Sequence, residues 1–232
     1  MKDKGWVPYP RYIFRKKIVL SLINKYVPKG SRFLEIGCAA GDIGITLSKI
    51  GYNGIMIDFS DEAYDHVIKN LKKEQVTNVR FEKKDFLKIN VEEKFDLITM
   101  FEVLEHIEND KQALKKVNDL LKAGGVFLLS VPSKAKLWGA SDIITGHIKR
   151  YEKQELFSLL SQSEFEIIKL LSYGFPWLNI AKYVRDKMAN RELKKNKAKN
   201  RISLTKKNGL NVSAISAPLL EFFLISFFYF SR

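Results

Sequence analysis

Residues 33–42 read Phe33-Leu34-Glu35-Ile36-Gly37-Cys38-Ala39-Ala40-Gly41-Asp42. The stretch begins as a buried strand, continues as a turn of small residues and leads into a helix pattern at Ile43, Leu47 and Ile50. A strand that turns sharply into a helix brings backbone N–H groups close to a ligand. Glu35 would lie near the carboxyl end of the strand, where parallel α/β folds place their sites. The alternative is a turn that needs glycine only for its geometry.

A buried carboxylate is costly without a partner, so we expect a cation or a backbone donor beside Glu35.

The chain of 232 residues fits one α/β domain with an accessory element. Its single cysteine, Cys38, excludes an internal disulfide framework and a cysteine-rich metal site. No signal-peptide pattern opens the sequence, so we expect a cytoplasmic location.

Strand and helix patterns alternate along most of the chain. We expect helices at 11–26, 62–73, 109–121, 152–162 and 177–199, and further strands at 54–58, 79–86, 95–101, 126–131 and 165–172. This order predicts an α/β fold with a doubly wound, mostly parallel Rossmann-like sheet and helices on both faces. We expect three regions: a lead-in and capping helix at 1–30, a binding domain at 31–175, and a helical extension at 176–232 that is basic and then apolar.

Carboxylates recur at the ends of the expected strands. Asp58 ends the second strand, where an acidic residue suits a pair of ribose hydroxyls. The alternative for Asp58 is a cap on the following helix, although Ser60 is also a plausible N-cap. Asp85, followed by Phe86, ends the third strand, and Glu102 follows the fourth.

The order and spacing of these motifs resemble class I S-adenosylmethionine-dependent methyltransferases. The motifs are Glu35-x-Gly37-x-Ala39-x-Gly41, Asp58, Asp85-Phe86, Glu102-Val-Leu-Glu-His106 and Leu121-Lys-Ala-Gly-Gly125. The most similar subgroup contains the ubiquinone-biosynthesis O-methyltransferases and many small-molecule methyltransferases. Gly146-His147-x-x-Arg150-Tyr151 is similar to the segment that follows the sheet in that subgroup. The resemblance covers residues 31–172.

The resemblance implies S-adenosylmethionine as cofactor and S-adenosylhomocysteine as product. It implies that Glu35 and the turn face the methionine part, Asp58 the ribose, and Asp85 with Phe86 the adenine, while Phe101 and Glu102 line the side of methyl transfer. The cofactor carries a sulfonium and an ammonium but no phosphate, and Asp42 stands where a phosphate-binding loop has lysine. We expect no metal. The expected cofactor-binding residues are Glu35, Gly37, Cys38, Ala39, Gly41, Asp58, Phe59, Asp85, Phe86, Phe101 and Glu102.

Two features depart from the family pattern. Ala39 stands in place of the middle glycine of the turn. The family sheet usually finishes with an antiparallel hairpin strand after a glycine-containing turn, and no such turn precedes the end of this sequence. We expect either that the last strand is missing or that the C-terminal part is rearranged.

His106 and His147 are the candidate catalytic residues. Methylation of an oxygen atom needs a base near neutral pKa or prior ionisation of the acceptor, and histidine can supply such a base. The alternatives are a support for the fourth-strand loop in the case of His106, and acceptor binding or loop anchoring in the case of His147. We expect a small-molecule acceptor, with O-methylation of a phenolic, quinone-like or lipidic compound. An RNA or protein acceptor, or a binding protein without turnover, is the alternative.

Most of the net charge of +14 falls within residues 182–207. The apolar stretch 218–230 is too short to span a bilayer, so it packs as a helix on the domain or on a partner, or it joins the basic stretch in binding an anionic membrane surface. Nucleic acid is less favoured, because aromatic residues are not interleaved with the charges. The sequence does not indicate the oligomeric state.

Overall fold

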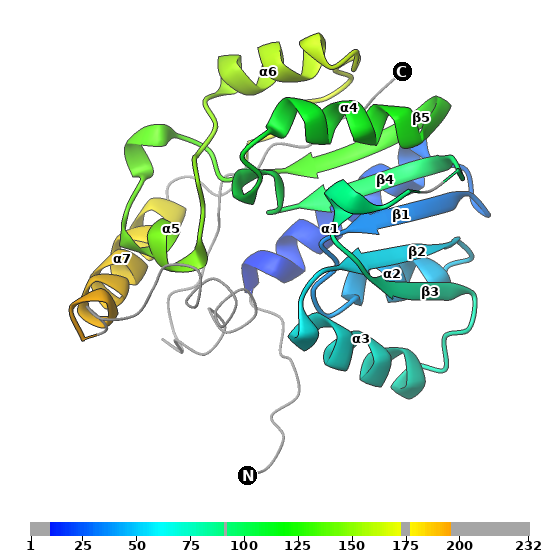
Figure 1. The fold of residues 1–232 in the computed structure, drawn as a ribbon, viewed down its shortest axis with the longest axis horizontal. Helices are drawn as coiled ribbons and strands as arrows, with labels where there is room; N and C mark the ends of the chain where they lie inside the picture. Colours follow the sequence, from blue (N-terminus) through cyan, green and yellow to red (C-terminus); the bar gives the residue numbers. More distant parts are fainter. Residues whose placement is uncertain (1–9, 91, 173–176, 196–232) are drawn as a thin grey trace.

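The computed structural model describes residues 10–90, 92–172 and 177–195. A five-stranded sheet forms the centre, with the strand order β3-β2-β1-β4-β5 and every neighbouring pair parallel (Figure 1). The order reverses between β1 and β4, so their carboxyl ends border the crevice where doubly wound sheets bind ligands. The strands are β1 (Arg32–Ile36), β2 (Asn53–Asp58), β3 (Val79–Lys83), β4 (Phe95–Phe101) and β5 (Leu121–Ser130).

Helices cover both faces of the sheet, as predicted. Side chains alternate between the two faces of a strand. Leu34 and Ile36 of β1 therefore join a core with α4 and α6, whereas Phe33 joins a second core with α1, α2 and α3. The helices are α1 (Pro10–Tyr26), α2 (Asp42–Lys49), α3 (Asp61–Lys73), α4 (Asp110–Leu120), α5 (Ala140–Thr145), α6 (Lys153–Gln162) and α7 (Trp177–Lys195), and the 3-10 turns are η1 (Phe86–Lys88), η2 (Leu104–His106) and η3 (Ala135–Leu137).

Helix α1 packs directly on the sheet. Val19, Leu22 and Ile23 are buried in the core that contains Phe33. Their spacing of three and four residues places them on one side of the helix. Full burial of each such side chain stabilises the fold by roughly 1.5–3 kcal/mol. The same helix also extends over the carboxyl end of the sheet, where it supplies polar side chains.

The prediction of a strand at 165–172 is wrong. This segment forms no strand; instead, Phe165 stacks on Phe127 with ring centroids 5.2 Å apart, and Ile167 and Leu170 pack against the same core. Its apolar pattern therefore reflects side-chain packing without backbone pairing. The predicted third strand ends early at Lys83, and β5 begins at Leu121, before the predicted start.

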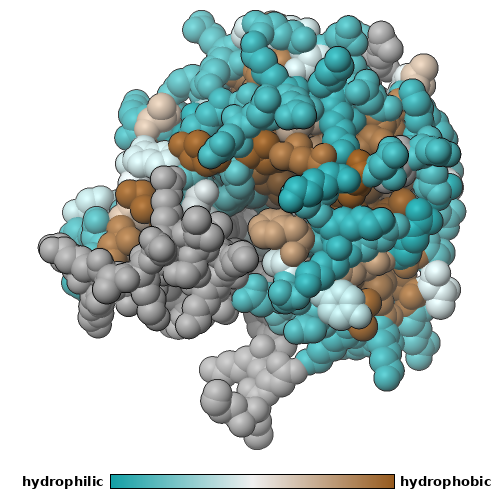
Figure 2. Space-filling view, in the orientation of Figure 1, coloured by the Kyte–Doolittle hydropathy of each residue, from teal (hydrophilic) through white to brown (hydrophobic). Residues whose placement is uncertain are grey.

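Helix α7 confirms the first part of the helix predicted at 177–199. It lies beside α5, away from the helices that cover the sheet (Figure 1). The space-filling view shows a face that is largely hydrophilic, with hydrophobic side chains visible between the polar ones (Figure 2).

No helix among residues 10–90, 92–172 and 177–195 is both long and apolar enough to cross a bilayer. The rest of the basic stretch and the apolar segment 218–230 lie outside the described residues.

Candidate active site

The loop after β1 is fastened to the end of β2 by its own backbone. The N–H groups of Gly37 and Cys38 donate to the Ile57 carbonyl at 2.9 and 3.1 Å, and the Ala39 N–H donates to Asp58 Oδ2 at 3.0 Å. These donors therefore fix the shape of the loop. Ala39 has a φ of 49°, a left-handed conformation that costs a residue with a side chain about 1–2 kcal/mol. Cys38 is buried behind the loop, and burial raises the pKa of its thiol well above the usual value.

Glu35 is a buried carboxylate with a backbone partner, as predicted. The side chain is 4% exposed, and Oε2 accepts a hydrogen bond from the Gly44 N–H at 2.9 Å. A Cβ at Gly44 would lie 2.7 Å from that oxygen, so glycine permits the close approach. Burial raises the Glu35 pKa to about 8, with further increases from the charges of Asp42 and Asp58, and the Gly44 hydrogen bond offsets only part of the shift. A bound cation would favour the ionised form.

Helix α1 supplies the cations nearest to the crevice. Arg15 Nη1 lies 3.4 Å from Glu102 Oε1, and the guanidinium lies 5.7 Å from the centre of the Phe101 ring. Lys16 Nζ lies 2.7 Å from Asp42 Oδ2. The sequence analysis missed these residues, because a helical pattern does not indicate which polar side chains lie over a site.

The loop after β4 packs tightly against the loop after β1. Glu102 has a φ of 57°; its N–H donates to the Ser130 carbonyl at 2.9 Å, and its Oε1 accepts from Ser130 Oγ at 2.8 Å. Strained backbone of this kind persists only when the surrounding contacts hold it. A Cβ at Gly37 would lie 2.3 Å from Val103 Cγ2. The two loops that border the crevice therefore fix each other.

Asp58 braces the backbone on both sides of β2. Its Oδ2 accepts from Ala39, and its Oδ1 accepts from the Ser60 N–H at 3.0 Å. The cap of α3 is Ser60, whose Oγ accepts from the Ala63 N–H at 3.1 Å. Asp58 is therefore not that cap. Its oxygens retain lone pairs for further donors, because a carboxylate has about four acceptor sites.

Phe86, expected beside the adenine, and Phe59, expected to bind the cofactor, differ in exposure. Phe86 is buried in the core beside α4, whereas Phe59 is 65% exposed. Asp85 Oδ1 accepts from the Leu87 N–H at 3.0 Å and so begins η1. An exposed ring can stack on a flat ligand, so Phe59 has the larger surface available for this contact.

Glu105, His106 and His147 form the histidine–glutamate cluster beside the end of β4. The Glu105 side chain is 0% exposed, and neither of its oxygens has a hydrogen-bond partner within the described part of the chain. Burial, and secondarily the charge of Glu102, raises the Glu105 pKa well above its usual value. His147 Nε2 lies 3.8 Å from Glu105 Oε1, and the two imidazoles meet edge to face, with centroids 4.9 Å apart. One ligand atom from each residue lies within 4.8 Å of the others, a spacing that could also hold a metal ion.

Both histidines have Nδ1 fixed by an acceptor. His106 Nδ1 lies 3.1 Å from the Gly146 carbonyl, and His147 Nδ1 lies 2.9 Å from Asp142 Oδ1. Carbonyl and ionised carboxylate oxygens only accept, so each neutral imidazole carries its proton on Nδ1 and leaves a lone pair on Nε2. Burial, and secondarily His147, lowers the His106 pKa to about 4, so His106 is neutral at pH 7.

The sequence analysis placed both histidines near the site, and the structure brings them into contact. The sequence did not indicate Asp142, a buried residue of α5 that accepts hydrogen bonds from both His147 and Arg150.

 The Asp142 residue is 1% exposed. Although burial alone would raise it, hydrogen bonds from His147 and Arg150 hold the Asp142 pKa well below its usual range. Glu105 stood inside a quoted motif, but only its burial reveals a role.

Comparison with known proteins shows the family to which the chain belongs. A family model described as a methyltransferase domain matches residues 9–170. The chain is 29% identical over 165 residues to a ubiquinone biosynthesis O-methyltransferase of Glaesserella parasuis, in an alignment that covers 63% of this chain and 70% of that protein. It is 31% identical over 121 residues to the protein of the same name from Coxiella burnetii, and this alignment covers 48% of the chain and 51% of the relative. The chain thus spans about half the length of the second relative.

A solved structure shares the fold. The N-methyltransferase NodS from Bradyrhizobium japonicum, in complex with S-adenosyl-L-homocysteine, superposes with a TM-score of 0.59 at 21% sequence identity. The superposition covers 74% of this chain and 82% of that protein. At this identity the likeness concerns the fold alone.

Proposed function

Because this chain belongs to the S-adenosylmethionine-dependent methyltransferase family, we propose that it methylates an oxygen atom of a small phenolic, quinone-like or lipidic acceptor. The enzyme class and the cofactor follow from the family. The observation that carries the oxygen acceptor is His147: its Nδ1 is held by Asp142, and its Nε2 lies 3.8 Å from the buried Glu105. An imidazole held in this way can take a proton from a hydroxyl group.

The residues of the crevice fit the cofactor. Bound S-adenosylmethionine supplies an electrophilic methyl group on a sulfonium whose sulfur keeps the bonding electrons. We propose that Glu35 holds the ammonium, since this buried carboxylate has a single backbone donor at Oε2 and a raised pKa that a cation would lower. Asp58 has acceptor sites left for the ribose hydroxyls, and the exposed Phe59 can stack on the adenine.

We propose that the acceptor is activated at the histidine–glutamate cluster. His147 Nε2 would take the proton of the acceptor hydroxyl, so that the oxygen could accept the methyl group that the bound cofactor would supply. Asp142 accepts from Nδ1 and so stabilises the imidazolium that forms. Burial raises the pKa of Glu105, and in its protonated form this residue can donate a hydrogen bond to a second oxygen of the acceptor.

The test combines cofactor binding with product formation. Titration calorimetry with S-adenosylmethionine, followed by an assay for S-adenosylhomocysteine over phenols, lipids and RNA, separates an O-methyltransferase from an enzyme acting on RNA and from a binding protein without turnover. Absence of cofactor binding would overturn the main assignment. His147→Ala should lower kcat by about 10²–10⁴-fold and leave the cofactor Kd unchanged. His66→Ala on α3 is the matched control, and unchanged turnover of His147→Ala would remove this residue from the mechanism.

An anionic membrane surface is a further proposed partner. It is supported by the sequence alone, through the basic stretch at 182–207 and the aromatic, apolar stretch at 218–230. Such an association would bring the enzyme to a lipidic acceptor.

A further inference from the structure

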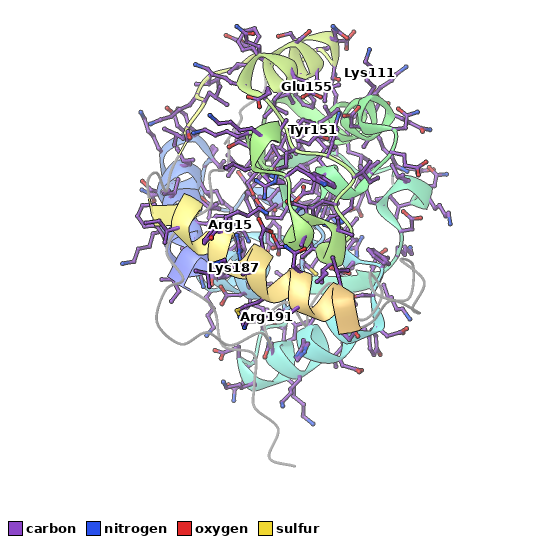
Figure 3. All side chains as sticks on the ribbon, turned by 90° about the vertical axis from the view of Figure 1, so that its left-hand side faces the viewer. Arg15, Lys111, Tyr151, Glu155, Lys187 and Arg191 are labelled. Carbon is purple, nitrogen blue, oxygen red and sulfur yellow. The ribbon has the colours of Figure 1, made fainter. Side chains whose placement is uncertain are left out.

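Helix α7 packs on α5 through a small apolar contact and a buried polar one. Ala140 and Ile144 of α5 meet Ala189 and Leu193 of α7. A Cβ at Gly139 would lie 2.3 Å from Asp186 Oδ2, so glycine lets the two helices approach closely. The view turned by 90° shows α7 crossing in front of the molecule, with Lys187 and Arg191 labelled along it (Figure 3).

Lys182 is the buried cation of this contact. It is 4% exposed, although it belongs to a stretch of the sequence that is rich in lysine. Its Nζ lies 2.6 Å from both oxygens of Asp186 and 3.0 Å from Asp142 Oδ2. A buried ammonium is costly unless carboxylates compensate it. A purely structural role would be to fasten α7 to α5.

Asp142 connects this contact to the histidine–glutamate cluster. Its Oδ2 faces α7 and accepts from Lys182 and from the Gly139 N–H at 2.8 Å. Its Oδ1 accepts from His147 Nδ1 at 2.9 Å and from Arg150, whose Nε and Nη2 lie at 2.9 and 2.8 Å. One carboxylate therefore divides its two oxygens between α7 and the site.

The way in which the two Asp142 oxygens are divided between α7 and the site depends on Lys182. A guanidinium and a carboxylate prefer two parallel hydrogen bonds, one to each oxygen. Arg150 instead directs two nitrogens at Oδ1, while Lys182 and Gly139 hold Oδ2 on the far side. Without Lys182, the Asp142 carboxylate can rotate toward the parallel arrangement with Arg150 and release Nδ1 of His147.

We propose that Lys182 is a positioning residue for the acceptor site, acting through Asp142 on the orientation of His147. The C-terminal helix α7 is then a working part of the active site. This inference rests on the proposed function, in which His147 takes the acceptor proton. The role of Lys182 is indirect, through the contact of its Nζ with Asp142 Oδ2.

Lys182→Met in the full chain tests the inference. The variant should lower kcat by about tenfold or more with the best phenolic acceptor of the panel, as loss of a supporting residue commonly does, and leave the KM for S-adenosylmethionine unchanged. Lys187→Met is the matched control, because it removes the same charge from an exposed position on the same helix. Wild-type kcat in Lys182→Met would overturn the inference.

A second measurement keeps the inference separate from the proposed function. Long-range ¹H–¹⁵N spectra of the imidazoles should show His147 protonated on Nδ1 in the wild type and in Lys187→Met, and a mixture of tautomers in Lys182→Met. An unchanged His147 signal would overturn the inference directly. Unchanged turnover of His147→Ala together with a changed His147 signal would overturn the proposed function and leave Lys182 with a structural effect on His147 alone. If circular dichroism shows that Lys182→Met is unfolded, Lys182→Met combined with Asp186→Asn, which avoids two uncompensated carboxylates, takes its place.

Discussion

We expect S-adenosylmethionine binding to release a proton from Glu35, and we expect Glu35→Gln to abolish that release. A pKa of about 8 leaves about nine-tenths of the Glu35 side chains protonated at pH 7 in the free protein. An opposite charge in contact lowers a carboxyl pKa by about 1–3 units. With a shift of about two units, the wild type should release about 0.8 proton at pH 7 and about 0.1 at pH 9.

Glu35→Gln should raise the stability of the free protein at high pH, although it weakens cofactor binding. Because the folded pKa of Glu35 lies above the unfolded value, the folded state binds more protons than the unfolded state between them. The stability that this group contributes is therefore full below the unfolded pKa and is lost as the pH rises through about 8. The loss is on the order of 5 kcal/mol as an upper limit. Free Glu35→Gln should thus be more stable than the wild type at pH 9, although it binds the cofactor less tightly.

Calorimetry in buffers of different ionisation enthalpy measures the protons released on binding. The comparison is made at pH 7, where the amino group of the free cofactor is mostly protonated, so the difference between the two proteins reports chiefly on Glu35. Denaturant unfolding of the free proteins at pH 5 and pH 9 measures the difference in their free energies of unfolding. Equal proton release by the wild type and by Glu35→Gln would refute the reasoning, because the raised pKa would then belong to no group that meets the cofactor.

Three further predictions concern other parts of the molecule. Gly37→Ala should lower the free energy of unfolding, measured with denaturant, by about 1–3 kcal/mol more than Gly124→Ala does. Both glycines have a positive φ, but only at Gly37 would a Cβ meet a neighbour, Val103. Equal losses in the two variants would exclude the clash. Dialysis against EDTA should leave turnover unchanged if the histidine–glutamate cluster works as a base, whereas a loss restored by Mg²⁺ would assign the cluster to a metal ion. Co-sedimentation with anionic vesicles should be strong at low salt and weak at high salt, because basic side chains would supply the attraction; absence of binding at low salt would count against a membrane surface.

The sheet could be predicted because its strands are continuous apolar runs. Strands buried on both faces read in this way, and Glu35, a buried carboxylate inside such a run, also indicated the site. The segment 165–172 misled the prediction, because period-two burial reports side-chain packing and does not report backbone pairing. Phe165 satisfies that pattern by stacking on Phe127.

The supporting residues of the site could not be predicted. Lys182 stands in a basic stretch where most side chains would be solvated, and only the approach of Asp142 and Asp186 in three dimensions explains its burial. Arg15 lies on a helix whose apolar spacing predicts the buried side but not the contact with Glu102. Arg15 and Lys182 each contact a carboxylate that is distant in the sequence, Glu102 and Asp142 respectively.

Because Cys38 is buried, chemical modification of its thiol can report the opening of the loop after β1. Alkylating reagents need an exposed thiolate, and Cys38 is buried with a raised pKa, so modification requires the loop to leave β2 first. With one cysteine in the chain, every modified molecule records one such opening. A ligand that binds only the closed loop slows the modification in proportion to its occupancy, so thiol labelling can rank cofactor analogues without any acceptor.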